Sequence, residues 1–251
     1  MDYLSYYRQT PTDKNDFIIM DSKTSDVNGD GIKDIVYLKG TKPLGPDSIV
    51  IGNIKVVIQD GKTGINYEIP LKVDKGYTPK LFLGSFTNDR IDDILISIES
   101  GNTGEERYYY IYSFINNSPK KLLDFEEFNN KYKYDVTYKN NYIVEIRSKL
   151  FDKNFIIDLK NKNESYLRAL YNQNGTLKEQ FEGYVSPIVN LHPVASESDY
   201  GYDLYAVQRV VGYYNADTLG MMVTPLRWDG RNFTVINNNP YLTLFGTEGI
   251  V

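Results

Sequence analysis

Short apolar runs alternate with turn-forming residues along most of the 251-residue chain. Within many runs, apolar and polar positions alternate with period two, which is typical of half-buried β-strands. The clearest runs are residues 35–38, 54–58, 67–71, 81–83, 94–98 and 108–114. Asp60-Gly61, Asn174-Gly175 and Asp229-Gly230 lie between runs and favour tight turns. Only residues 122–128 and 164–171 have helical spacing, so the pattern predicts an all-β fold.

A loop rich in oxygen side chains recurs before three of these runs. The three loops begin at Asp26, Ser85 and Ala195, which are 59 and then 110 residues apart. A period of this size in a chain of strands predicts a β-propeller-like fold of four or five blade-like units, in a single domain over residues 1–251. A unit near residues 135–160 would then lack the loop. The alternative is a β-sandwich with three Asp-rich turns.

The first loop has the spacing of a calcium site. Oxygen side chains stand at places one, three, five and nine, which are Asp26, Asn28, Asp30 and Asp34. The backbone carbonyl of Ile32 stands at place seven, and Gly31 at place six allows the chain to turn around an ion. Calcium takes six to eight oxygen ligands at flexible geometry, whereas zinc and copper prefer nitrogen and sulfur. The sequence therefore predicts Ca²⁺ at this loop, which leads straight into a strand.

The second and third loops have lost ligands. The second loop would offer Ser85, Thr87, Asp89, Ile91 and Asp93, in which Ser85 and Thr87 replace stronger ligands. Arg90 takes the place of the glycine and could pair with the neighbouring carboxylates instead of an ion. The third loop keeps Glu197, Asp199 and Asp203 but has no acid at its first place and no glycine at its sixth. Calcium is therefore expected mainly in the first loop.

Composition excludes several kinds of function. The chain has 28 basic and 33 acidic residues, which disfavours a nucleic-acid partner. It has no Cys, so disulfides and thiolate metal sites are absent, and His192 is its single histidine, so no three-histidine zinc site is available. The N-terminus has no signal-peptide pattern, and no apolar run approaches the ~18 residues of a membrane-spanning helix. We therefore expect no membrane insertion.

Two other features leave alternatives open. Glu99, Glu105 and Glu106 flank a Gly-rich turn and could serve as the paired carboxylates of a glycoside hydrolase, although a solvated hairpin tip is the simpler interpretation. Eight of the 23 tyrosines lie at residues 108–112 and 202–214. Tyrosine combines apolar area with a polar group, so these clusters could bind a sugar or a protein, or could be ordinary packing.

The loops resemble the integrin-type calcium repeats called FG-GAP or VCBS repeats, and the chain is similar to VCBS-repeat-containing proteins of spore-forming Firmicutes. The stretches that carry the resemblance are residues 8–11, 26–38, 57–64, 81–97, 110–114 and 213–220. It implies a propeller-like fold with calcium in the first loop. It also implies a noncatalytic structural or ligand-binding role at a spore or cell surface, with a surface glycan or coat protein as partner. Ser85 and Arg90 depart from the family pattern, and a cytoplasmic location stays open.

Overall fold

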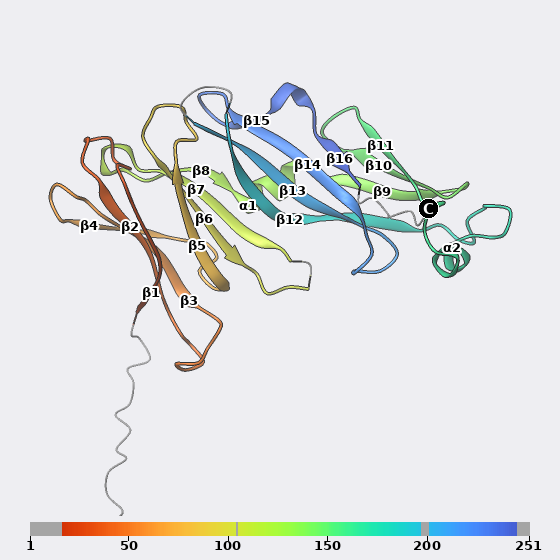
Figure 1. The fold of residues 1–251 in the computed structure, drawn as a ribbon, viewed down its shortest axis with the longest axis horizontal. Coiled ribbons are helices and arrows are strands. Elements are labelled where there is room, and N and C mark those ends of the chain that lie inside the picture. Colours follow the sequence, from red (N-terminus) through yellow and green to blue (C-terminus); the bar gives the residue numbers. More distant parts are fainter. Residues whose placement is uncertain (1–16, 104, 197–200, 245–251) are drawn as a thin grey trace, which may run out of the picture.

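A computed structural model describes residues 17–103, 105–196 and 201–244, and it confirms the all-β fold (Figure 1). The first four-stranded sheet is an antiparallel meander of β1 (Ile18–Ser25), β2 (Asp34–Thr41), β3 (Gly52–Gln59) and β4 (Asn66–Pro70). The second repeats this order with β5 (Tyr77–Gly84), β6 (Asp93–Glu99), β7 (Arg107–Ser113) and β8 (Lys120–Asp124). Each sheet is a four-stranded antiparallel meander, a strand order that propeller blades also have.

The rest of the described chain forms one eight-stranded sheet. Its strands in spatial order are β11 (Asn154–Asp158), β10 (Ile143–Ser148), β9 (Tyr134–Lys139), β12 (Glu182–Ala195), β13 (Tyr202–Val211), β14 (Thr218–Trp228) and β15 (Phe233–Val235), and β16 (Tyr241–Thr243) pairs with β14. Figure 1 shows the three sheets following one another along the long axis of the molecule. The second half of the chain is therefore one continuous sheet and not a series of separate blades.

The 59-residue period of the sequence is a structural period. β1 and β5 begin and end 59 residues apart, and β2 and β6 both begin at the aspartate that ends the loop. The two sheets meet through their first strands, where the backbone N–H of Leu81 in β5 donates to Asp21 Oδ2 in β1 at 2.9 Å. The first two sheets are therefore repeats of one unit.

A third copy of the unit lies within the eight-stranded sheet. β12 pairs with β9 only near its start, at Glu182 and Gly183, and with β13 along the rest of its length. Consistent with this, Leu191, Leu204 and Leu226 pack in the same hydrophobic core as the first two sheets. A second core lies between β9, β10, β11 and the second helix. The end of β12 together with β13, β14 and β15 thus forms the third blade-like unit, and β9–β11 extend it.

The two helices lie near the predicted positions. α1 (Phe125–Lys131) begins later than expected, because residues 120–124 pair with β7 as β8. The side chain of Asp124 caps α1 by accepting from the N–H of Glu126 at 2.8 Å. α2 (Glu164–Leu170) matches the predicted helix, with Asn163 as its cap. Short 3₁₀ turns, η1 (Ile115–Asn117) and η2 (Ile236–Asn238), follow β7 and β15.

Candidate functional site

The first aspartate loop curls around its own side chains. Asp26 accepts from the N–H groups of Gly29 and Gly31, at 2.7 and 2.9 Å, one on each carboxylate oxygen. Asn28 Oδ1 accepts from the N–H of Asp30 at 3.0 Å, and Asp30 Oδ1 accepts from the N–H of Ile32 at 2.9 Å. The glycines have φ of 82° and 84°, a conformation that other residues adopt with strain. The loop thus holds three of the predicted ligands in place.

Asp34, the fourth predicted side-chain ligand, has a different position. It is fully buried, and its two oxygens accept from the N–H of Val27 at 3.1 Å and from the N–H of Gly61 at 2.9 Å. It therefore closes the loop and ties it to the β3–β4 turn. Within the described residues, no three His, Cys, Asp or Glu side chains are grouped so that they could hold a metal ion. An ion here would rely on Asp26, Asp30, Asn28 and the Ile32 carbonyl, with water completing the shell.

Two turns brace this loop from the side, which the sequence did not reveal. The Asn28 amide donates to Asn117 Oδ1 at 3.1 Å, and the Asn117 amide donates to Asp60 Oδ2 at the same distance. The N–H groups of Thr63 and Lys62 donate to Asp60 and hold its pKa below the usual range, against a smaller opposing effect of burial. The sequence marked Asp60 only as a turn residue, and Asn117 lies in η1 after β7. They connect the first loop to both neighbouring hairpins.

The second loop repeats the first in backbone but not in ligands. Asn88 and Arg90 replace the two glycines and keep a positive φ, at 63° and 68°. Asp93 corresponds to Asp34, and its Oδ2 accepts from the N–H of Phe86 at 2.9 Å and from the backbone and hydroxyl of Thr87, both at 3.1 Å. Burial raises the pKa of Asp93 to about 7, and these hydrogen bonds only partly oppose that rise.

The other candidate ligands of the second loop do not converge with Asp93 into a cluster of acidic side chains within the described part of the chain. Asp89 accepts from the N–H of Ile91 at 3.0 Å, as Asp30 does in the first loop. The Ser85 hydroxyl is buried and has no hydrogen-bond partner among the described residues. The second loop therefore keeps the turn of a calcium loop with fewer side chains able to ligate.

In the third unit, an arginine binds the buried aspartate. Asp203 stands where Asp34 stands in the first unit, and the Arg227 guanidinium binds its two oxygens at 2.9 and 2.7 Å. Asp229 accepts from two N–H groups of its own turn just as Asp60 does. Glu197 and Asp199, which the sequence marked as further ligands, lie outside the described residues. The third unit thus keeps the buried aspartate and neutralises it within the protein.

Backbone hydrogen bonds join the second loop to the first and to the described end of the third. The N–H of Asp92 in the second loop donates to the Asp26 carbonyl in the first at 3.2 Å. The N–H of Tyr202, near the end of the third loop, donates to the Ser85 carbonyl at 2.9 Å. In addition, a Cβ on Gly29 would lie 2.7 Å from Ile91 Cδ1, so the first two loops are in direct contact.

The glutamates that could act in a glycoside hydrolase lie in a pocket away from the aspartate loops. Glu99, Glu105, Glu106 and His192 line one pocket of about 700 Å³, between the β6–β7 hairpin and β12. Glu99 is engaged by Arg107 at 2.6 Å. The sequence had placed the glutamates at a hairpin tip and treated His192 separately, and only the tertiary structure brings the histidine next to them.

The tyrosines divide into a buried set and an exposed set. Tyr109, Tyr110 and Tyr112 of β7 are buried, and the Tyr110 hydroxyl accepts from the N–H of Val73 at 2.9 Å. Tyr213 and Tyr214, on the β13–β14 hairpin, are exposed and their rings touch. The cluster at residues 108–112 is thus core packing, while the hairpin presents aromatic surface. No helix among the described residues is long and apolar enough to cross a membrane.

Comparison with known proteins corrects the resemblance to FG-GAP and VCBS repeats. The family model that matches is described as the YybI C-terminal domain, and it covers residues 132–241, from the end of α1 to β16. FG-GAP and VCBS repeats are not found. The physical reason is that any short loop built around an ion needs the same alternating oxygen ligands and glycines, so the motif recurs in unrelated families.

A relative covers the chain more fully. The uncharacterized protein YybI of Bacillus subtilis (strain 168) is 37% identical over 230 residues, which is 92% of this chain and 86% of that protein. No solved structure matches the chain. The extent of this match, which takes in the first two sheets as well as the C-terminal domain, shows that the chain belongs to the YybI family.

Proposed function

We propose that the protein is a noncatalytic binding protein whose first aspartate loop takes up Ca²⁺ as a structural ion. The observation that carries this proposal is the loop geometry: two carboxylates and an amide oxygen, from Asp26, Asp30 and Asn28, are held on one turn by backbone N–H groups. Asp30 and its neighbours are exposed, so an ion can reach the loop from solvent. Each carboxylate oxygen keeps a second lone pair for a metal.

Calcium would stabilise the fold through this loop. Without an ion, the negative charges of Asp26 and Asp30 repel each other across a tight turn. An ion bound only by the native state stabilises it by about 2.7 kcal/mol at a concentration of 100 times Kd. For a chain of this size, that corresponds to a rise in Tm of roughly 5–10 °C. Because the first loop contacts the second loop and the β3–β4 turn, a bound ion would also help to hold these two neighbours in place.

The test is thermal unfolding in Ca²⁺ and in EGTA. We expect Ca²⁺ to raise the Tm of the wild-type protein and Asp30→Ala to remove that rise, since the variant lacks one of two charged ligands. Asp152→Ala is the matched control, because Asp152 is an exposed aspartate between β10 and β11, far along the chain from the loop. A wild-type Tm that is the same in Ca²⁺ and EGTA would refute the calcium role.

A further inference from the structure

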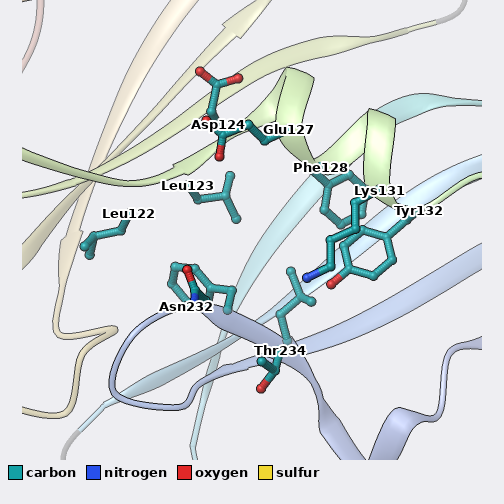
Figure 2. Close-up of a pocket in the computed structure, with 11 residues that line it drawn as sticks. Leu122, Leu123, Asp124, Glu127, Phe128, Lys131, Tyr132, Asn232 and Thr234 are labelled. Carbon is teal, nitrogen blue, oxygen red and sulfur yellow. The ribbon is translucent and has the colours of Figure 1, made fainter. Parts of the chain in front are cut away.

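A small cavity lies where the second and third units meet, between α1 and β15 (Figure 2). Its volume is about 210 Å³. Leu123, Phe128, Leu226 and Phe233 give it apolar walls, and all four are part of the main hydrophobic core. Lys131 and Tyr132, at the end of α1, add polar groups. The cavity is therefore built from rigid elements and combines an apolar body with a polar end.

Tyr132 directs a hydroxyl without a partner into this cavity. Its side chain is 4% exposed, and its hydroxyl makes no hydrogen bond to any residue that the structure describes. Tyr132 is one of the lining residues, and Figure 2 shows its hydroxyl oxygen on the side of Lys131. Burial raises the pKa of Tyr132 to about 12, so the hydroxyl stays protonated and able to donate at neutral pH. The hydroxyl oxygen is not among the fully buried unpaired oxygens of the described residues, so solvent reaches it and a ligand oxygen could take the place of water.

Lys131 brings a positive charge to the same place. Its ammonium lies 5.2 Å from the centre of the Tyr132 ring and forms no ion pair within residues 17–103, 105–196 and 201–244. In Figure 2 its Nζ and the Tyr132 hydroxyl extend into the same space. Two donors, one of them charged, point to an acceptor with negative charge.

The acidic residues of the cavity do not cancel this charge. Asp124 and Glu127 lie at the other end in Figure 2. Both are bound by Lys121, at 3.0 and 2.9 Å. Lys121 therefore offsets part of the negative charge of Asp124 and Glu127. Lys131 is then the lining cation that can pair with a ligand.

We propose that this cavity binds a small monocarboxylate with an apolar body, whose carboxylate accepts hydrogen bonds from the Tyr132 hydroxyl and the Lys131 ammonium. The volume is below the usual range for drug-sized ligands, so it suits a single ring or a short branched chain. The site rests on the proposed binding role and names its ligand class, but it does not use the calcium loop. It joins two units of the fold, so a bound ligand would also hold them together.

Benzoate is the probe, with benzamide and benzylamine as neutral and cationic molecules of similar shape. Ligand-detected NMR and calorimetry on the full chain, in Ca²⁺ and again in EGTA, measure the affinities. We expect benzoate to bind more tightly than benzamide, and benzylamine not to bind. Lys131→Met should weaken benzoate binding about tenfold, the effect of one charge-assisted hydrogen bond. Tyr132→Phe, which keeps the ring, should weaken it severalfold.

Lys133→Met and Tyr134→Phe are the matched controls, because both residues are close in sequence but do not line the cavity. They should bind benzoate like the wild type. The proposal is overturned if benzoate does not saturate the protein by about 10 mM. It is also overturned if benzylamine binds as tightly, or if Lys131→Met leaves the affinity unchanged. Benzoate binding with no effect of Ca²⁺ on the Tm refutes the calcium role alone, and a Ca²⁺ effect without benzoate binding refutes the cavity alone.

Discussion

The buried carboxyl of Asp93 makes a sharp prediction about stability and pH. Asp93 is 2% exposed, and burial raises its pKa to about 7 from the ordinary value of 3.8. In the unfolded chain the group returns to its ordinary pKa, so the native state binds the proton more tightly. This stabilising contribution is fully present below pH 3.8 and is lost as the pH rises through 7. Stability due to this one group therefore falls between those two values.

The size of the effect follows from the shift. Each pKa unit is worth 1.36 kcal/mol, so a shift of about three units corresponds to at most about 4 kcal/mol. Asp93→Asn keeps an oxygen to accept from the N–H of Phe86 and Thr87 but never carries a charge. We expect the variant to gain stability relative to the wild type as the pH rises, and to be the more stable protein at pH 8.

The assay is urea unfolding of both proteins in EGTA at about pH 4.5, 6 and 8, and the difference between them isolates Asp93 from the other carboxyls. A difference that does not change with pH would refute the reasoning. Repeating the series in Ca²⁺ tests the second loop as well. An ion that coordinates Asp93 would remove the charge penalty at pH 8, and the two proteins would then no longer diverge.

The remaining predictions concern the third unit and the turn of the first loop. Arg227→Met should lower the free energy of unfolding by about 2 kcal/mol, because it leaves the buried Asp203 without its arginine, and adding Asp203→Asn should restore part of the loss. A double-mutant cycle in urea measures both effects, and additive losses of the two single variants would contradict the pairing. Gly29→Ala should cost more than Gly31→Ala in thermal unfolding, because both have positive φ but only the first would place its Cβ against Ile91; equal losses would show that this contact is unimportant.

The sequence identified most local structure. Apolar runs located the strands around residues 35–38, 54–58 and 94–98, because many of their side chains lie in the core. β2 alternates between buried and more exposed positions, whereas residues 93–96 of β6 are all buried. The recurrence of the loop located three related units, because each needs an aspartate to close a tight turn before its second strand. The sequence also has a second spacing common to two units: Asp229 follows Asp203 by the same 26 residues that separate Asp60 from Asp34. The family assignment failed, since the loop motif is too short to distinguish families.

Only the tertiary structure decided what each aspartate does. Asp34 accepts from the N–H of Gly61 in the β3–β4 turn, and Asp203 binds Arg227 of β14, whereas Asp93 accepts from the Thr87 hydroxyl of its own loop. Alternation does not predict which of these partners each aspartate meets. The pairing of β9 with the start of β12 and the cavity beside Tyr132 also arise from the packing of segments that are far apart in the sequence. Alternation reports which face of a strand is buried, a local property, whereas the partner of a buried polar group depends on how separate units pack together.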